Sequence, residues 1–260
     1  MTEVVPALGT LEIAALAGAA FVAGFVDAIA GGGGLVTVPA LLGFHLPTHF
    51  ALGTNKGQSV FGATASVVSF ARKGAIDRGR ALPAFLFALV GAFAGAAIQL
   101  AVPKEPLRPV ALALLVVAAA LVALRPVLLR GAAPAEPRPR PSAAAAIAFV
   151  LGLYDGFFGP GTGTLLVIAY VTFLGDPMTR ASGNAKVANF ASNLASVVLF
   201  AVRGTVIWKI SIPMAVGNAL GAALGVRVAL KRGDDFIRVV LLVVVVALAL
   251  KLGWDIARGG

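Results

Sequence analysis

The chain has 260 residues, of which 59% are hydrophobic and only 12% are charged. Soluble domains carry about 25% charged residues, so this composition predicts an all-α polytopic membrane protein and argues against a soluble helical domain. There is no cysteine, which excludes disulfides, thiolate metal sites and cysteine nucleophiles, and the two histidines alone do not make a metal site. We therefore expect no metal and no cofactor.

Apolar segments follow one another along the whole chain. Most are about 20 residues long, enough to cross a hydrocarbon core of roughly 30 Å. Residues 35–44 and 163–174 are too short to span comfortably. The segments lie at residues 11–30, 35–44, 49–71, 81–102, 107–124, 143–158, 163–174, 182–202, 207–229 and 236–257.

Each short segment follows a glycine-rich break that carries one carboxylate. Residues 24–34 read GFVDAIAGGGG, and residues 152–163 read GLYDGFFGPGTG. In both, a glycine precedes the aspartate, Asp27 or Asp155, by three residues and another follows it by four. We expect each segment to turn at its glycines and to return as a shorter arm, re-entrant or hairpin.

The two halves of the chain are related along most of their length. Lys56 returns as Lys186, Gly91 as Gly221 and Gly95 as Gly225, each 130 residues later. Asp27 and Asp155 are 128 residues apart, so two residues entered the second half after Asp155. This periodicity predicts two homologous transmembrane repeats, 1–124 and 143–260, each with one broken segment and three transmembrane helices.

Residues 125–142 alternate proline with arginine and cannot continue a helix, so we interpret them as the linker between the repeats. Basic residues concentrate in this linker and in loops 72–80 and 230–238, which is the pattern of cytoplasmic loops. The net charge of +10 is therefore read as membrane topology and not as nucleic-acid binding. If each broken segment reverses direction, the two repeats are inverted relative to each other.

The glycine breaks are candidate anion sites. Free N–H groups at the start of a helix attract anions through hydrogen bonds and the helix dipole. The alternative is that glycine only permits the turn, and the breaks lack the Gly-Lys-Ser/Thr ending of a phosphate loop. The predicted cradle residues are Gly31, Gly32, Gly33, Gly34, Gly161, Thr162 and Gly163.

Lys56 and Lys186 stand early in long apolar segments, where an unpaired lysine is costly. They either snorkel to the interface or face a polar site. Neighbouring amides and hydroxyls favour the polar site and are predicted to bind substrate with the lysines: Thr54, Asn55, Gln58, Asn184, Asn189 and Asn193. Asn218 is a second-tier pathway residue, whereas Gln99 and Arg227 are expected at the interface.

Asp27 and Asp155 lie inside the apolar segments. Each either pairs with a lysine and caps the glycine cradle, or carries a coupling proton. These alternatives remain open at the level of sequence.

The duplicated Gly-x-x-Asp-x-x-x-Gly break, followed by Gly53-Thr54-Asn55-Lys56 in one half and Asn184-Ala185-Lys186 in the other, resembles the TauE/SafE sulfite exporter family of permeases. The resemblance covers residues 10–257 and implies transport of sulfur-containing anions such as sulfite or organosulfonates. Pro160 in place of Gly32 and Ala185 in place of Asn55 imply that the two sites are unequal, or that only one binds.

The expected function is that of a secondary transporter in the cell inner (plasma) membrane, not an enzyme. The anion would bind near the bilayer midplane between the repeats and cross by alternating access, with proton or ion coupling possible. Its partners would be a small anionic substrate and the lipid bilayer, and no nucleic acid. An anion channel is the alternative. An intramembrane diaspartyl hydrolase is disfavoured because the Gly-x-Gly-Asp signature is missing.

Overall fold

The computed structural model describes residues 8–103 and 140–257, with residues 6, 107, 109–111, 113, 114, 116 and 117. These residues form α-helices and no strand. Most of the predicted segment 107–124 and of the predicted linker 125–142 lies outside the described residues.

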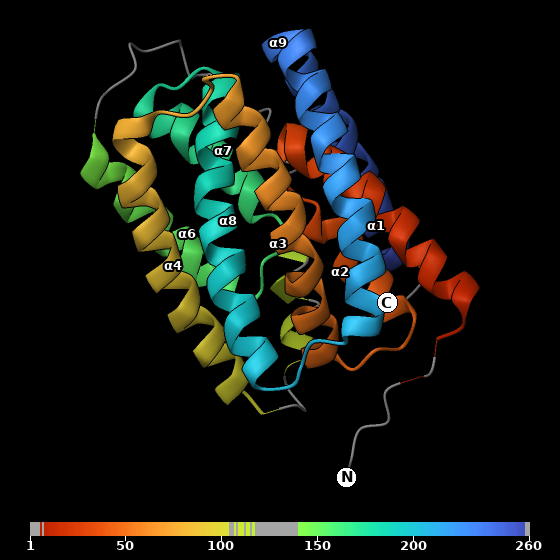
Figure 1. The fold of residues 1–260 in the computed structure, drawn as a ribbon. Helices are drawn as coiled ribbons and strands as arrows, with labels where there is room; N and C mark the ends of the chain where they lie inside the picture. The colour runs from red at the N-terminus through yellow and green to blue at the C-terminus, as the bar shows by residue number, and fades with distance from the viewer. Residues whose placement is uncertain are drawn as a thin grey trace.

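Eight helices are described, four from each half (Figure 1). The first half contains α1 (Thr10–Ala30), α2 (Gly34–Gly43), α3 (Thr48–Arg72) and α4 (Arg78–Ala101). The second half contains α6 (Pro141–Phe157), α7 (Thr162–Leu174), α8 (Met178–Val202) and α9 (Trp208–Ala257). Seven of them begin and end within a few residues of predicted segments, whereas α9 covers both 207–229 and 236–257, which were predicted as separate segments joined by a loop. The chain is a multi-pass membrane protein.

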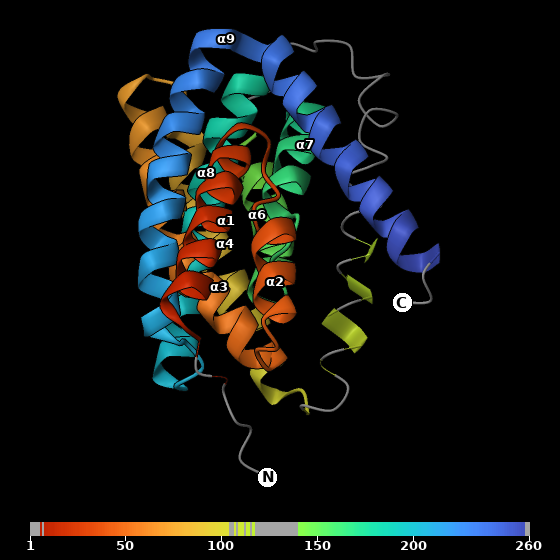
Figure 2. The ribbon, with the colours of Figure 1, turned by 90° about the vertical axis from the view of Figure 1, so that its right-hand side faces the viewer.

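Within the described residues, four helices are long and apolar enough to cross a membrane: Thr10–Ala30, Arg78–Ala101, Met178–Val202 and Trp208–Gly233. The last is the first part of α9, which bends at Gly233, where φ is 76°, and then runs back down the molecule (Figure 2). Helix α3 has 25 residues but carries a polar stretch between Gly53 and Ser59, which lowers its hydropathy below that of the other long helices.

The glycine breaks turn where only glycine is free of strain. Gly31 and Gly32 have φ of 76° and 91°, and Gly159 and Gly161 have φ of 99° and 87°. Side chains with a Cβ are strained at such angles. Proline fixes φ near −65°, so the second break takes its positive φ values on either side of Pro160. The predicted reversal after each carboxylate-bearing helix is therefore present in both halves.

The first helix of each half packs against the fourth helix of the other half. A Cβ at Gly221 in α9 would lie 2.0 Å from the carbonyl oxygen of Phe21 in α1. A Cβ at Gly91 in α4 would lie 2.3 Å from the carbonyl oxygen of Phe149 in α6. Small residues permit this close backbone approach where lipid supplies no hydrophobic drive. Since these positions correspond in the repeat, the two interfaces are copies of one packing.

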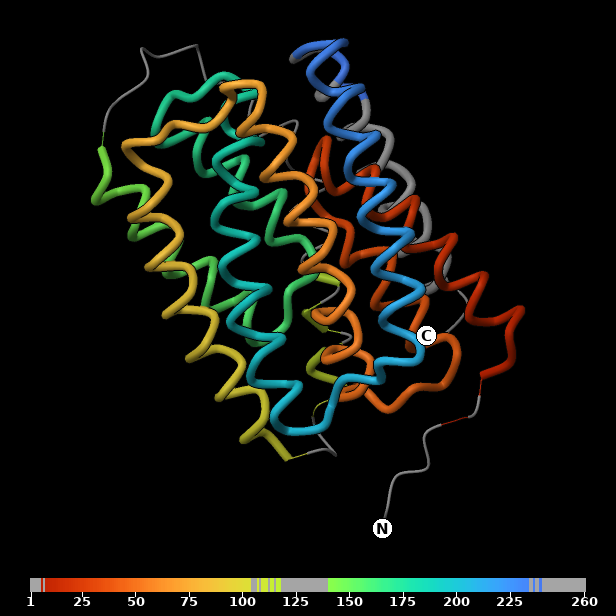
Figure 3. Tube along the Cα trace, in the orientation of Figure 1, coloured from red at the N-terminus to blue at the C-terminus, as the bar shows by residue number. Residues whose placement is uncertain are grey.

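Equivalent helices of the two halves run in opposite directions. Gly53 near the start of α3 approaches Thr205 just beyond the end of α8, and Gly183 near the start of α8 approaches Ala75 just beyond the end of α3. Figure 3 shows α3 and α8 running antiparallel to each other. It is the arrangement that an inverted repeat requires.

The helices form two bundles that do not coincide with the halves of the sequence. Helix α9 packs against α1 and α3, which we group with α2 as the first bundle. Helix α4 packs against α6 and α8, which we group with α7 as the second bundle. The bundles lie side by side in Figure 1 and meet along α3 and α8.

Two of the predicted basic loops, 72–80 and 230–238, lie at the same end of the described structure. Phe70, Ala75 and Ile76 at the end of α3 pack with Leu230 near the bend of α9. Loop 72–80 and the start of 230–238 are therefore neighbours, as the charge pattern predicts.

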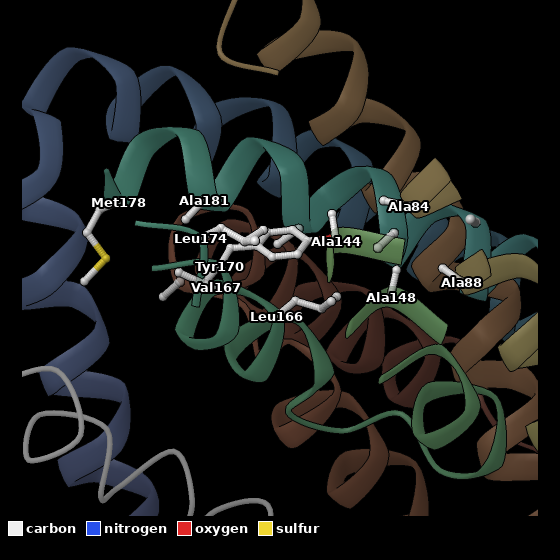
Figure 4. Packing of buried hydrophobic residues seen from close by; sticks show 14 of the residues in the cluster. Ala84, Ala88, Ala144, Ala148, Leu166, Val167, Tyr170, Leu174, Met178 and Ala181 are labelled. Atoms are coloured by element: carbon white, nitrogen blue, oxygen red, sulfur yellow. The ribbon is translucent and has the colours of Figure 1, made fainter. Parts of the chain in front are cut away.

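The core of the second bundle surrounds α7. Tyr170 and Leu174 of α7 pack among alanines of α4, α6 and α8, including Ala84, Ala144 and Ala181 (Figure 4). The small alanine side chains let α4, α6 and α8 contribute to a core on one face of the short α7, while Phe173 on another face is 64% exposed. This packing fixes the position of its N-terminus, where the second glycine break lies.

Candidate functional site

The two glycine breaks meet at a small polar cavity between the bundles. Its volume is about 30 Å³, room for roughly two water molecules. Both halves contribute charged, amide and glycine residues to its wall: Asp27, Gly32, Gly33, Gly34, Asn55, Lys56, Ser59, Asp155, Gly159, Gly161, Gly163, Asn189, Asn193 and Asn218.

Two ion pairs cross between the halves at this cavity. Lys186 Nζ lies 2.6 Å from Asp27 Oδ2, and Lys56 Nζ lies 2.8 Å from Asp155 Oδ1. Each pair joins the first helix of one half to the third helix of the other, and each also joins the two bundles. Both lysines are buried, at 2% exposure for Lys56 and 1% for Lys186, so the snorkelling alternative is wrong. The pairing with a lysine, one of the two roles considered for each aspartate, is present.

The breaks themselves are in contact. A Cβ at Gly31 would lie 2.2 Å from the backbone nitrogen of Thr164, whose hydroxyl donates to the carbonyl of Ala30 at 3.0 Å. The N–H of Gly33 donates to Asp27 Oδ1 at 3.1 Å. Helices α2 and α7 therefore both begin at the cavity, where their first N–H groups lack acceptors within the helix.

The amide side chains in the cavity wall are oriented by other polar groups. Asn55 Oδ1 accepts from the Thr37 hydroxyl at 2.6 Å and from Gln58 Nε2 at 3.0 Å. Asn189 Oδ1 accepts from Asn193 Nδ2 at 3.2 Å. Because the oxygens of Asn55 and Asn189 are occupied as acceptors, their amide nitrogens are the groups that can donate to a ligand.

Several predicted substrate-binding residues lie outside the cavity wall. The Thr54 hydroxyl accepts from the Ile207 N–H at 3.0 Å, and Asn184 Oδ1 accepts from the Asp77 N–H at 2.8 Å. These contacts correspond in the repeat and tie each third helix to a loop. Lys186 contacts Asp27 but does not itself line the cavity. Three others contact residues of the cavity wall: Gly31 packs against the backbone of Gly163, the Thr162 hydroxyl donates to the Gly159 carbonyl, and Gln58 donates to Asn55.

Ser59, which the sequence places on the polar face with Gln58, lines the cavity at the position that corresponds to Asn189. Sequence reasoning missed a serine of the second half. Ser192 donates its hydroxyl to Asp155 Oδ2. Its counterpart is Gly62, which gives no signal. The Asn218 side chain occupies the space beside Gly62, because a Cβ at Gly62 would lie 1.5 Å from Asn218 Oδ1.

The two aspartates differ in access to water. The Asp27 side chain is 22% exposed, whereas that of Asp155 is 2% exposed. Asp155 receives a lysine and a serine hydroxyl, and Asp27 receives a lysine and a backbone N–H. The pseudo-symmetric sites are thus chemically unequal, which was one of the expectations from the departures between the repeats.

A second ionic cluster lies at the basic end of the second bundle. Arg80 pairs with Asp77 at 2.8 Å and with Asp176 at 2.6 Å, and Asn184 Nδ2 donates to Asp176 at 3.1 Å. Partial burial raises the pKa of Asp77, but the hydrogen bonds and charge of Arg80 outweigh it and hold that pKa below its usual value. The positions that correspond to Asp176, Asp77 and Arg80 are apolar in the other half, where Leu46, Ile207 and Ile210 share one hydrophobic cluster.

The sequence analysis expected Gln99 at the membrane interface. This prediction is wrong, because only 1% of the residue is exposed. Neither atom of its amide finds a partner in the described part of the chain. Proximity to a helix end was a poor guide because the start of α3 and the residues just after α8 lie beside the end of α4 there. Within residues 8–103 and 140–257, no group of three histidine or acidic side chains could hold a metal ion.

The chain is similar to known membrane proteins along almost its whole length. Residues 16–252 match the family model described as Sulfite exporter TauE/SafE. A probable membrane transporter protein, ORF9, from Sinorhizobium sp is 37% identical over 90% of this chain and 89% of its own. A probable membrane transporter protein from Haemophilus influenzae is 38% identical over 90% of this chain and 92% of its own.

The probable membrane transporter protein YfcA of Escherichia coli K12 is 34% identical over 91% of this chain and 87% of its own. No solved structure matches the chain significantly. The relatives are named as membrane transporters, which points to a protein that is not an enzyme. The family model matches residues 16–252, and the helices are long and apolar enough to span a membrane. The chain therefore belongs to the TauE/SafE sulfite exporter family of membrane transporters.

Proposed function

We propose that this chain is a secondary transporter for small sulfur-containing anions, such as sulfite or organosulfonates, in the cell inner (plasma) membrane. The observation that carries the proposal is the central cavity, where two lysine–aspartate pairs, two helix N-termini and amides from both halves converge. The family match supports the same substrate class.

The chemistry of the cavity suits an oxyanion. Helices α2 and α7 direct the positive ends of their dipoles at it, and their glycines expose backbone N–H groups. Asn55, Asn189 and Lys56 add side-chain donors from α3 and α8. Sulfite and sulfonate groups offer several acceptor oxygens on one centre, which can take donors from both sides of the cavity at once. In this proposal, four of the predicted ligands do not touch the anion and instead stabilise the helices and turns around the cavity: Thr54, Gln58, Asn184 and Thr162.

The size and position of the cavity support alternating access as the mechanism. A void for roughly two water molecules is too small for an organosulfonate, so the bundles must separate to admit one. Two inverted bundles that meet at the site can rock about it and open it to either side in turn. A permanently open anion channel would need a wider continuous path, so we place the channel second.

A diaspartyl hydrolase is disfavoured by the pairing of the carboxylates. Such enzymes share a proton between two aspartates, whereas Asp27 and Asp155 each hold a different lysine. For orientation, we assign the end that carries loop 72–80 to the cytoplasm, because basic loops remain inside.

The test is exchange of labelled sulfite and organosulfonates in proteoliposomes. Wild type is expected to show saturable counterflow, and Lys186→Gln is expected to lose it, because the positive charge beside the cavity is gone. Lys209→Gln removes an exposed lysine at the start of α9 and is the matched control, with exchange retained.

A single Lys56→Gln change leaves Asp155 buried without its partner and risks misfolding, so Lys56→Gln/Asp155→Asn is the second variant. It is expected to fold and to exchange no anion. Folded wild-type protein that exchanges no sulfur oxyanion, or that passes single-channel currents, would contradict the transporter proposal.

A further inference from the structure

The two crossed ion pairs occupy equivalent positions, yet only one of their carboxylates is open to water. Asp27 lines the cavity and is 22% exposed. Asp155 is 2% exposed and is held by both Lys56 and the Ser192 hydroxyl. Asp155 lines the same cavity but is covered, so of the two aspartates Asp27 is the one placed to exchange a proton with outside water.

The charges at the cavity cancel before any substrate arrives. Asp27, Lys56 and Asp155 line it, and Lys186 contacts Asp27 from behind. An anion that entered this site would face two carboxylates, and each lysine would already be engaged by one of them. An uncompensated charge at membrane depth is costly, so a negative substrate requires that one carboxylate lose its charge.

The other charged side chains near α1 do not alter this balance. From the helices that pack against α1, α3 brings Lys56 and α8 brings Lys186, while α2 and α7 contain no charged residue. Arg72 and Arg180, at the ends of α3 and α8, are exposed. In α9, the charged side chains described are exposed as well: Lys209, Arg227, Lys231 and Arg232.

We propose that Asp27 is the binding site for a coupling proton, and that one proton crosses together with each monovalent anion. A proton from water adds to Asp27 Oδ2 and breaks the ion pair with Lys186. The freed ammonium of Lys186 then compensates the incoming anion. On the other side the anion leaves, Asp27 returns its proton to water, and the pair with Lys186 forms again. No net charge moves in the cycle.

The same event couples proton binding to movement. Both ion pairs bridge the two bundles, since Asp27 and Lys56 belong to the first and Lys186 and Asp155 to the second. Protonation of Asp27 removes one of the two bridges, and the Lys56–Asp155 pair remains as a fixed link. Binding of the proton and the anion thus loosens the contact that keeps the cavity closed.

This inference rests on the proposed function, so the experiment measures anion and proton together. Proteoliposomes with a trapped pH dye receive methanesulfonate, a strong-acid anion that brings no proton, and sulfite in parallel. In wild type, an inward anion gradient is expected to acidify the lumen, with one proton per methanesulfonate. A membrane potential clamped by potassium and valinomycin is expected to leave the rate unchanged.

Asp27→Asn imitates the protonated side chain permanently, so it is expected to exchange anion without moving protons. A proton carried by sulfite itself would still move in this variant, which separates the two sources. Asp27→Glu keeps a titratable carboxylate and is expected to restore proton movement. Glu12→Gln, at the first turn of the same helix, is the matched control with one proton per anion.

Three results would overturn the assignment of the proton to Asp27. They are wild-type anion flux without proton movement, undiminished proton movement in Asp27→Asn, and a folded Asp27→Asn that exchanges no anion. The first two leave anion transport standing. A wild type that carries neither sulfite nor methanesulfonate would instead overturn the proposed function, and the coupling with it.

Discussion

Every buried charged side chain in the described residues has a partner of opposite charge. One such cluster is present in only one half, so a comparison of the halves shows what can replace it. Arg80, Asp176 and Asn184 form an ionic cluster in the second bundle. At the corresponding positions the first bundle has Ile210, Leu46 and Thr54. The same backbone arrangement thus accepts either a polar or an apolar filling.

We predict that Arg80→Ile alone is more harmful than Arg80→Ile/Asp176→Leu/Asn184→Thr. The single change leaves Asp176 buried and unpaired, at a cost of about 3 kcal/mol, whereas the triple variant copies the filling of the other half. The hydroxyl introduced by Asn184→Thr would accept the Asp77 N–H as Thr54 accepts that of Ile207. Thermal unfolding in detergent measures the difference. A triple variant that melts below the single one would show that the halves are not interchangeable here.

The sequence located the chemistry of the central site but not its connections. The repeat offset identified both lysines, both aspartates and most amides of the cavity wall. It could not reveal that Asp27 pairs with Lys186, because the partners are 159 residues apart and belong to different halves. Thr54 and Asn184 were predicted as ligands from polarity alone, and the structure engages both as acceptors for loop N–H groups instead.

At the scale of helices, glycine decides which surfaces can meet. The glycines of α4 and α9 bring these helices against α6 and α1 with no room for a side chain between the backbones. The Gly-x-x-x-Gly spacing at Gly91 and Gly95, and again at Gly221 and Gly225, is typical of such close helix packing. Which helices would be paired could not be read from it, because the same motif fits any neighbour with small residues.

We predict that Gly221→Ala destabilises the protein and that Gly18→Ala does not. A Cβ at Gly221 would lie 2.0 Å from the carbonyl oxygen of Phe21, so α1 and α9 must move apart, at a cost of about 1–3 kcal/mol. A Cβ at Gly18 meets nothing within 4 Å, and alanine favours the helix by up to about 1 kcal/mol. Melting temperatures of the two variants check this. Equal melting temperatures would mean that the interface yields easily.

For the whole molecule, the units of tight helix packing are the two bundles and not the two halves of the sequence. Helix α9 belongs with α1 and α3, and α4 belongs with α6 and α8. The predicted repeats, divided at residues 124 and 143, therefore differ from the packed bundles, because each fourth helix packs on the first helix of the other half. The repeat pattern could not disclose this exchange, because it compares each half with the other and contains nothing about which half a helix packs on.

We predict that a disulfide between the bundles stops transport and that one inside a bundle does not. The chain has no cysteine, so any introduced pair is the sole pair. Val60 of α3 and Val197 of α8 share a hydrophobic cluster across the bundle interface, whereas Leu16 of α1 and Met214 of α9 share one within the first bundle. Sulfite counterflow is measured for Val60→Cys/Val197→Cys and for Leu16→Cys/Met214→Cys, each oxidised and then reduced.

The oxidised inter-bundle pair is expected to block counterflow reversibly, because a covalent link at the interface prevents the bundles from separating around the cavity. The oxidised intra-bundle pair is expected to keep it, since α1 and α9 move together. If the intra-bundle link blocks counterflow instead, α1 must slide along α9 during transport. The moving unit would then be the broken helices alone, within a stationary frame of long ones.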